Sequence, residues 1–306
     1  MGELLKDRVA LITGSSQGIG KAIALEMAGE GAKVITNNRK PGAEGGDAET
    51  TASAIKDGGG QAIPVYGDVA SFDEAQRLVQ EAVDNFGRID ILVTCAGTDA
   101  PRMIWNMTEN EWDRCLDSYL KGTFNCVRHA CGFMRQQRWG RIILMTSEAF
   151  LGTVGHANYG AAKGGIVGFA RSVAREMGRY NVTCNALAPE AGTRFTLAPA
   201  VVEGFKKRHE AGLITKERLD ELLGVPPPEY LSPFVVYLAS EPAANINGQV
   251  FRAAGGEITL YSEPVRMKSI FKGEGKWTQA ELAEVIPKTL AAGLVNPAPP
   301  ESPSSG

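Results

Sequence analysis

The sequence predicts an α/β protein with a doubly wound parallel sheet. Short apolar runs recur through the first 190 residues. Most are apolar at consecutive positions, as in parallel strands that are buried on both faces of a sheet. Between them lie longer segments with a helical pattern of apolar and polar residues. Strands that alternate with helices in this way build a sheet whose crossover helices cover both faces.

The elements follow in order along the chain. The expected strands cover residues 9–13, 32–36, 62–66, 89–94, 141–146, 182–187 and 248–252. The expected helices cover residues 18–30, 46–58, 71–86, 108–137, 156–178 and 229–240. No linker is evident before residue 256, so we expect a single domain over 1–256 and a C-terminal extension over 257–306. The extension should contain one amphipathic helix, 279–291, and its last ~10 residues should be flexible.

The alternation changes over residues 190–228, after the sixth expected strand. Two polar helical segments, 198–211 and 215–223, end at Pro226-Pro-Pro228. Ligands of open α/β sheets bind beyond the carboxyl ends of the strands, where this segment begins. We therefore expect a helical substrate lid here, with a surface excursion as the alternative.

Composition and charge exclude several classes of protein. The 306 residues are 43% hydrophobic and 22% charged, and the net charge is −3. Basic residues are dispersed, which argues against a nucleic-acid partner. Neither a signal peptide nor an apolar run of membrane-spanning length is evident, so we expect a cytoplasmic protein without a membrane partner. The five cysteines and three histidines form no metal-ligand pattern, and we expect reduced thiols and no metal.

A glycine-rich turn, Thr13-Gly-Ser-Ser-Gln-Gly-Ile-Gly20, joins the first expected strand to the first expected helix. Glycines let the backbone turn tightly and approach a pyrophosphate, whose charge is favoured at a helix N-terminus. The spacing differs from the commoner G-x-G-x-x-G, but the strand-turn-helix context supports the same task. We assign the phosphates of a dinucleotide to Gly14, Ser15, Ser16, Gln17, Gly18, Ile19 and Gly20.

The end of the second expected strand indicates which dinucleotide binds. A carboxylate at this place would bind the ribose hydroxyl of NAD, whereas the chain has the neutral Asn38 followed by Arg39 and Lys40. Cations beside a neutral side chain favour the additional phosphate of NADP(H) over NAD(H). A solvated basic loop is the alternative, and NAD stays open because Gln17 adds no basic group to the turn. Asp68 and Val69 are placed to contact the adenine.

Tyr159 and Lys163 are four residues apart in an expected helix, so their side chains share one face. A free tyrosine has a pKa of about 10, and a neighbouring cation lowers it. A shift of about 3 units would give an acid/base poised near neutral pH. Ser147 precedes this pair by twelve residues.

Together these residues resemble the short-chain dehydrogenase/reductase family between about Arg8 and Gly256. The matching pieces are the glycine turn, Asp68-Val69, Ala96-Gly97, Ser147, Tyr159 with Lys163, Asn185-Ala-Leu-Ala-Pro189 and Ile246-Asn-Gly-Gln249. The resemblance implies a three-layer Rossmann fold, a homotetramer or dimer, and hydride transfer between NAD(P) and a carbonyl or secondary alcohol. It also implies the site roles. Ser147 binds the reacting oxygen, Tyr159 transfers its proton and Lys163 holds the nicotinamide ribose. The remaining cofactor contacts are Cys95, Ala96, Gly97, Pro189 and Thr193.

A narrower resemblance is to the hydroxyacyl-CoA dehydrogenase unit of multifunctional β-oxidation enzymes. It is carried by Arg102-Met-Ile-Trp-Asn-Met-Thr, Gly155-His-Ala-Asn-Tyr159 and the long tail. The substrate class could accordingly be a 3-hydroxyacyl or 3-oxoacyl thioester, or a cyclic alcohol. His156 could contact substrate, although a packing or surface role fits it better. Met103, Trp105 and Met107 fit a core or an interface better than a substrate cage.

Three positions depart from the family pattern. Cys95 and Tyr119 replace asparagines, and Glu190 replaces the glycine that usually follows Pro189. These departures keep an alternative open, a non-catalytic nucleotide-binding subunit that supports an active partner. A residue is also missing before Tyr159, so an ungapped alignment would put Thr146 in the place of the serine. We favour Ser147.

Overall fold

The computed structural model describes residues 2–43, 46–98, 101–193, 196–212 and 214–298. The chain divides into two compact units, Met1–Tyr261 and Ser262–Gly306. The first unit contains the sheet and every candidate site residue, and the described part of the second contains one helix.

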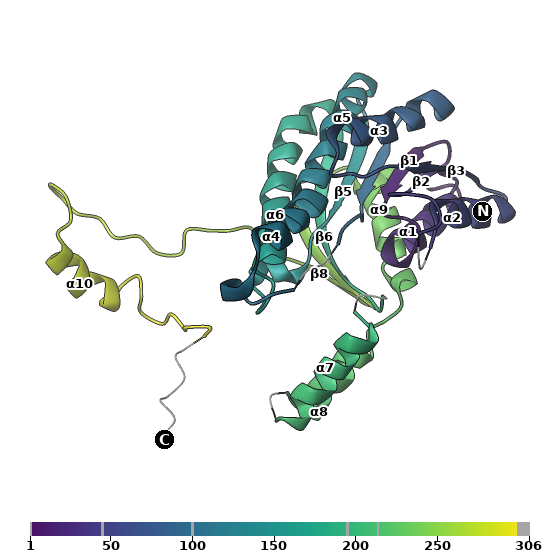
Figure 1. The fold of residues 1–306 in the computed structure, drawn as a ribbon. Helices are drawn as coiled ribbons and strands as arrows, with labels where there is room; N and C mark the ends of the chain where they lie inside the picture. Colours follow the sequence, from purple (N-terminus) through teal and green to yellow (C-terminus); the bar gives the residue numbers. More distant parts are fainter. Residues whose placement is uncertain (1, 44–45, 99–100, 194–195, 213, 299–306) are drawn as a thin grey trace. The chain divides into compact units, whose positions relative to one another are not determined.

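One eight-stranded sheet forms the centre of the first unit (Figure 1). Its strands are β1 (Val9–Thr13), β2 (Lys33–Asn38), β3 (Gln61–Tyr66), β4 (Ile91–Thr94), β5 (Gly140–Met145), β6 (Val182–Glu190), β7 (Val250–Ala254) and β8 (Glu257–Leu260). They lie in the order β3-β2-β1-β4-β5-β6-β7-β8. All neighbours are parallel except β7 and β8, which are antiparallel. The predicted doubly wound parallel sheet is confirmed.

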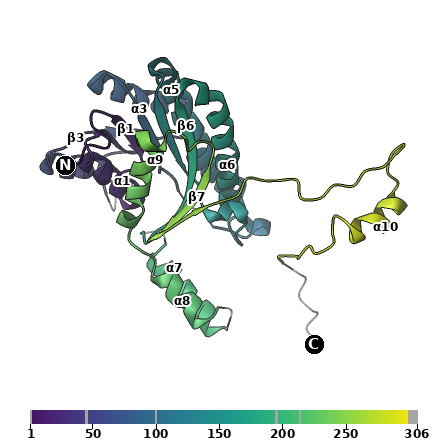
Figure 2. The ribbon, with the colours of Figure 1, turned by 180° about the vertical axis from the view of Figure 1, so that it is seen from behind.

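Helices cover both faces of this sheet (Figures 1 and 2). The helices of the first unit are α1 (Gly18–Gly29), α2 (Ala48–Asp57), α3 (Phe72–Phe86), α4 (Glu109–Leu116), α5 (Gly122–Gln137), α6 (Ala157–Met177), α7 (Pro199–Glu210), α8 (Lys216–Leu223) and α9 (Ser232–Leu238). Apolar side chains of α3, α5 and α6 pack on one face, and those of α1, α2 and α9 on the other. The result is the expected three-layer Rossmann fold.

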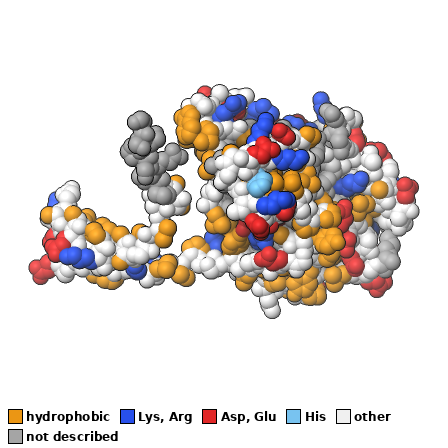
Figure 3. All heavy atoms as spheres, turned by 90° about the horizontal axis from the view of Figure 1, so that it is seen from below, with side chains coloured by type: hydrophobic (Ala, Val, Ile, Leu, Met, Phe, Trp, Pro, Cys, Tyr) orange, Lys and Arg blue, Asp and Glu red, His pale blue; other side chains and the backbone are white. Residues whose placement is uncertain are grey.

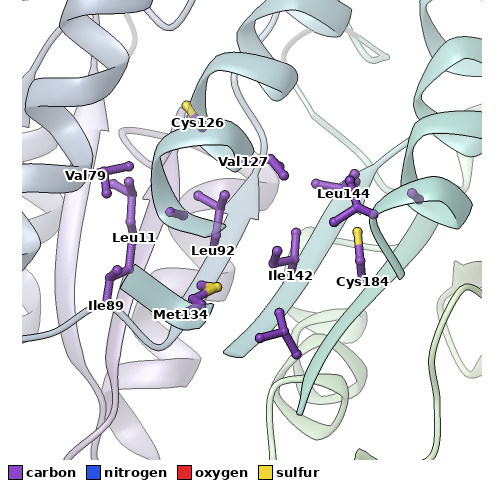
Figure 4. Packing of buried hydrophobic residues seen from close by; sticks show 14 of the residues in the cluster. Leu11, Val79, Ile89, Leu92, Cys126, Val127, Met134, Ile142, Leu144 and Cys184 are labelled. Atoms are coloured by element: carbon purple, nitrogen blue, oxygen red, sulfur yellow. The ribbon is translucent and has the colours of Figure 1, made fainter. Parts of the chain in front are cut away.

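The buried strands explain why this arrangement forms. Figure 4 shows the core on the α3–α5–α6 face, where side chains from neighbouring strands meet those of the helices. Leu11, Leu92 and Ile142 are fully buried there and come from three different strands. Removing such side chains from water contributes about 1.5–3 kcal/mol each, which fixes the strands in their order beneath the site.

Two features differ from the elements that the sequence predicted. The expected helix 108–137 is not regular, because the π-helical segment Asp117–Lys121 separates α4 from α5. Strand β8 was not predicted at all. Its residues are mostly exposed and show no apolar run, and it forms because its backbone pairs with β7 in the register Phe251↔Leu260. Backbone pairing of this kind cannot be predicted from the pattern of apolar and polar side chains.

The segment after β6 contains α7 and α8, which pack on each other. Its two ends are joined, since the Gly192 amide donates to the Pro226 carbonyl at 2.7 Å. The segment therefore leaves the core and returns to it at one place.

The second unit is held by local contacts around α10 (Gln279–Lys288). Thr278 and Glu281 form a reciprocal capping box at the start of this helix. The Lys272 ammonium pairs with Glu281 at 2.6 Å, and Lys268 donates to the Ala292 carbonyl at 2.6 Å.

The charges on the surface are mixed in sign. In the view of Figure 3, acidic and basic side chains lie interspersed over the face shown.

Candidate active site

The candidate residues gather at the carboxyl edge of the sheet. The glycine turn follows β1, Arg39 follows β2, Asp68 follows β3 and Cys95 follows β4. Tyr159 and Lys163 lie in the first turns of α6, beyond the end of β5. The strand order reverses between β1 and β4, which is where open α/β sheets bind dinucleotides.

The glycine turn has the geometry that a phosphate needs. Gly14 and Gly18 adopt positive φ angles of 64° and 54°, which other residues rarely tolerate. A Cβ on Gly20 would lie 2.4 Å from the Gly14 carbonyl oxygen, so the turn closes against α1 only with glycine there. In this described stretch, Gln17 makes no side-chain cap and the first turn of α1 contains no acidic residue. The helix N-terminus thus fits an anionic diphosphate group.

Asn37 fastens this turn to the neighbouring strands, a role that the sequence reasoning missed. Its Oδ1 accepts from the Gly14 amide at 3.2 Å, while its Nδ2 donates to the carbonyls of Val65 and Gly67 at 3.1 and 3.2 Å. The side chain is buried, so these bonds replace water that it has lost. The available signal was the pair of asparagines, Asn37 and Asn38, at the end of β2.

The loop after β2 is organised by Asn38. Its Oδ1 accepts from the Ala48 amide at 3.0 Å and its Nδ2 donates to the Lys40 carbonyl at 2.9 Å, so the amide shapes the entry into α2. Arg39 and Lys40 are exposed. The loop returns to the glycine turn at Gly46, where an added Cβ would lie 2.3 Å from the Ser16 carbonyl oxygen.

The residues after β3 and β4 form the next part of the edge. The Asp68 carboxylate accepts from the Ala70 amide at 3.0 Å, and Val69 is buried. The Ala96 amide donates to Thr13 Oγ1 at 3.2 Å, which joins the turn after β4 to the end of β1. A Cβ on Gly14 would lie 2.7 Å from the Ala96 Cα atom, so the two turns are in direct contact.

Lys163 and Tyr159 are brought together at the start of α6. The Lys163 Nζ lies 5.5 Å from the centroid of the Tyr159 ring, and it donates to the Met145 carbonyl at 2.6 Å. Lys163 is buried, and this burial lowers its pKa to about 7. The ammonium of Lys163 is therefore a group whose protonation can change in the physiological range.

The structure distinguishes Ser147 from Thr146. The buried Thr146 hydroxyl donates to the Lys163 carbonyl at 2.8 Å, so it fastens α6 to the end of β5. Ser147 is half-buried and its Oγ accepts from the Ala149 amide at 3.2 Å. The serine hydroxyl keeps its proton available for another acceptor.

Tyr119 lies beside this pair, at a position where the family pattern has asparagine. Its ring centroid lies 4.2 Å from the Lys163 Nζ and 5.1 Å from the Tyr159 ring centroid. The ring also lies against Gly97, where an added Cβ would come within 1.9 Å of it. The replacement at Tyr119 is evident in the sequence, whereas these contacts appear only in the structure.

Three carboxylates surround Arg252 of β7 at the same edge. Its guanidinium pairs with Glu190 at the end of β6, with Glu257 at 2.9 Å and with Glu148 at 3.3 Å. Glu148 also accepts from the Tyr261 hydroxyl at 2.5 Å. The carboxylate that replaces glycine after Pro189 is thus held by an arginine. Thr193, three residues further on, has an amide that donates to Thr196 Oγ1 at 2.7 Å.

Exposed apolar side chains come from the loops that follow β4 and β5. Met103 and Trp105 are exposed, which rules out the core position and leaves the interface alternative untested, and Leu151 and Val154 are exposed as well. The two loops are joined, since the Arg102 amide donates to the Gly155 carbonyl at 2.7 Å. The ring centroid of His156 lies 5.9 Å from that of Tyr159.

The fold and the glycine turn define a dinucleotide-binding Rossmann protein. Comparisons with known proteins identify the family within this class. The family model described as short chain dehydrogenase matches residues 8–196. The hydroxyacyl-CoA dehydrogenase ChsB1 of Mycobacterium tuberculosis is 36% identical over 293 residues, which cover 92% of this chain and 88% of that protein. The 3-oxoacyl-(acyl-carrier-protein) reductase of Synechocystis sp. is 36% identical over 256 residues, which cover 83% of this chain and 98% of that protein.

A solved structure agrees with these sequence relatives. The crystal structure of a short chain dehydrogenase from Mycobacterium avium superposes with a TM-score of 0.80 at 36% identity, and the match covers 94% of this chain and 96% of that one. The chain belongs to the short-chain dehydrogenase/reductase family, as its motifs indicated. It is an oxidoreductase that depends on NAD(P).

Among the described residues, no group of three or more His, Cys, Asp or Glu side chains is arranged to hold a metal ion. No described helix combines the length and the apolar character needed to cross a membrane.

Proposed function

We propose that the protein transfers a hydride between NADP(H) and a ketone or secondary alcohol, with Ser147, Tyr159 and Lys163 as its catalytic residues. The observation that carries the proposal is the Lys163 ammonium, buried 5.5 Å from the centroid of the Tyr159 ring. A nicotinamide cofactor bound here would supply or accept the hydride. Side chains of this protein would transfer the proton and bind the substrate oxygen.

In the direction of reduction, Tyr159 donates its phenolic proton to the substrate oxygen as negative charge develops there. Ser147 donates a second hydrogen bond to the same oxygen and so fixes its place. Lys163 stabilises the phenolate that Tyr159 becomes, because a cation nearby favours the charged form of an acid. In oxidation the same groups act in reverse, and the phenolate accepts the proton of the alcohol.

The substrate class that we favour is a 3-oxoacyl or 3-hydroxyacyl thioester. Support comes from the relatives named for hydroxyacyl-CoA and 3-oxoacyl substrates. The exposed side chains of Met103, Trp105, Leu151 and Val154 also offer apolar surface for the body of such a substrate. We further propose that residues 190–228 act as a lid, since their joined ends at Gly192 and Pro226 would let the segment move as one piece.

Assembly into a dimer or tetramer is part of the proposal. The exposed phenylalanines Phe72 of α3 and Phe124 of α5 support it, because they stack with ring centroids 6.3 Å apart on the surface of the helical layer. Apolar side chains that remain exposed side by side favour contact with another copy.

Tyr159→Phe tests the proposed acid/base. We expect kcat for ketone reduction to fall about 10³-fold, because the proton donor is lost, while the Kd for NADPH changes less than about twofold. Stopped-flow turnover and fluorescence titration of NADPH measure the two quantities. Tyr230→Phe, which alters an exposed tyrosine, should leave both unchanged.

Unchanged turnover of Tyr159→Phe would remove Tyr159 from the chemistry. NADPH binding by the unaltered protein, without turnover of any ketone or secondary alcohol, would instead support a nucleotide-binding subunit.

Arg39→Ala tests the preference for NADP. The guanidinium is exposed, so its attraction to the additional phosphate is screened by water, and we expect the KM for NADP to rise about fivefold. The KM for NAD should stay within about twofold because NAD lacks that phosphate. Lys56→Ala, at the far end of α2, is the matched control. Equal effects on both cofactors would contradict a phosphate contact.

A further inference from the structure

The buried ammonium of Lys163 is enclosed mainly by aromatic rings. The Tyr119 ring lies nearest, with its centroid 4.2 Å from the Nζ atom, and the Tyr159 ring centroid lies at 5.5 Å. The ammonium donates a hydrogen bond to the Met145 carbonyl at 2.6 Å. Among the described residues, Lys163 forms no ion pair with a carboxylate.

The other titratable groups around Lys163 are weak acids. The Cys95 thiol faces it from the turn after β4 and the Cys115 thiol faces it from α4. Desolvation raises the pKa of Cys95 to about 12, so this thiol stays neutral and offers no counter-charge. His156 contacts Tyr159 from the start of α6. Asp117 and Lys121, on the same π-helical segment as Tyr119, are exposed and pair with each other at 3.3 Å.

We propose that Tyr119 is a positioning residue for the reaction, and that the π face of its ring keeps the Lys163 ammonium charged beside Tyr159. The negative face of an aromatic ring attracts a cation, and the attraction is strongest where water is excluded. The 4.2 Å separation lies well within the range of about 6 Å over which this attraction acts. Tyr119 thereby supplies part of what a carboxylate would otherwise supply, without adding a negative charge next to the phenol.

Two features of the fold place the ring there. The π-helical segment Asp117–Lys121 widens the helix at this residue, and such segments are often found at functional sites. Gly97 lacks the Cβ that would collide with the ring. The ring also contacts Tyr159 edge-on at 5.1 Å, so it touches both members of the acid/base pair.

The inference rests on the proposed function, because it concerns the acid/base pair Tyr159 and Lys163. Without the ring face of Tyr119, a smaller fraction of Lys163 would be protonated. The Tyr159 phenolate would then be less stabilised, so the pKa of Tyr159 should rise. In alcohol oxidation the phenolate is the active form. The rise of kcat/KM with pH should then move to higher pH.

Tyr119→Phe and Tyr119→Leu separate the ring from its hydroxyl. We expect Tyr119→Phe to keep the pH profile of kcat/KM for oxidation within about 0.3 units, because the π face remains. Tyr119→Leu should move the profile upward by about one pH unit, a tenfold loss of kcat/KM on the rising limb. Tyr180→Leu is the matched control, since Tyr180 carries the Arg179 guanidinium 4.9 Å from its ring, outside the site.

A fluorination series keeps the test decisive should Tyr119→Leu fail to fold. Replacing Tyr119 by phenylalanine and by its mono-, di- and trifluorinated analogues weakens the π face stepwise at nearly constant size. The pH profile should move upward with each fluorine. A profile that stays in place along the series, or an equal shift in Tyr119→Phe and Tyr119→Leu, would overturn the role of the ring face.

These outcomes are distinct from failure of the proposed function. If Tyr159→Phe keeps its turnover, the acid/base assignment itself is wrong. If Tyr159→Phe loses turnover while the fluorinated series leaves the pH profile unchanged, only the role of Tyr119 is wrong.

Discussion

Both edges of the sheet bury a cation against aromatic rings, but they neutralise it differently. At the amino edge, the guanidinium groups of Arg8 and Arg141 lie 3.7 and 4.3 Å from the centroid of the Trp139 ring. Carboxylates complete this cluster. At the carboxyl edge, the Lys163 ammonium has two tyrosine rings and a backbone carbonyl, and no carboxylate pairs with it in the described chain.

At the amino edge, the buried charged groups have hydrogen-bond or ion-pair partners for most of their polar atoms. The buried Asp90 carboxylate accepts from the Val9 amide at 3.0 Å and from Arg88 at 2.6 and 2.7 Å, and it lies 3.6 Å from Arg8. Arg141 donates to the carbonyls of Ser240, Gly140 and Asn181. Hydrogen bonds of this number offset the loss of water around the buried charges.

The presence or absence of carboxylate partners indicates whether the buried cation stabilises the fold or takes part in the reaction. A cation with carboxylate partners keeps its charge at every physiological pH and ties strands together. A cation held by aromatic rings and a backbone carbonyl, without a carboxylate, keeps a pKa that its surroundings can change, and its charge can act on a neighbouring acid. Mutation should therefore lower stability at the amino edge, whereas at the carboxyl edge it should lower activity and raise stability.

The largest effect is expected at the amino edge. Asp90→Ala should lower the free energy of unfolding by about 2–4 kcal/mol, because the Val9 amide and two guanidinium groups lose their partner. Turnover per folded molecule should change less than about twofold. Urea denaturation with an activity assay measures both, and Asp84→Ala, on the exposed side of α3, is the control. Loss of activity in fully folded protein would show that the edges are coupled.

At the carboxyl edge we expect a smaller change in the free energy of unfolding, with the opposite sign. In the cofactor-free protein, Lys163→Met should abolish turnover yet raise the free energy of unfolding by about 1–3 kcal/mol at pH 6, because no ammonium is then buried. Denaturation of both proteins at two pH values measures the difference. Lys121→Met, at an exposed position, is the control.

The sign of the pH dependence follows from the two pKa values. The folded pKa of Lys163 is lowered to about 7, below the ~10.4 of a free lysine. Between these values the unfolded chain binds more protons, so the stability of the unaltered protein rises with pH across this window. The advantage of Lys163→Met should therefore shrink from pH 6 to about pH 9. A variant less stable at both pH values would contradict the comparison.

Several parts of the site could be predicted because they depend on local sequence. Gly14, Gly18 and Gly20 specify a strand-turn-helix unit within eight residues, and the spacing of Tyr159 and Lys163 follows from helical periodicity. The preference of Ser147 over Thr146 came from its distance to the start of a strand. These assignments of chemistry stay predictions until the variants are measured.

Other parts could not be predicted because they join residues that are distant in sequence. Asn37 joins the glycine turn to the residues at the end of β3, and no spacing in the sequence indicates such bonds. Arg252 gathers carboxylates from residues 148, 190 and 257. Tyr119 could be recognised as a replacement, but its contact with Gly97 depends on a π-helical segment that a periodic pattern does not reveal.

The sequence alone determined the alternation of the first seven strands with helices, the glycine turn and the helical face shared by Tyr159 and Lys163. Each of these depends on backbone preferences or on a periodicity of a few residues. Only the tertiary structure decided which groups surround Lys163 and which surround Asp90. The protonation of a buried charge depends on the field of every group within a few ångströms, and the fold brings those groups together from separate segments of the chain.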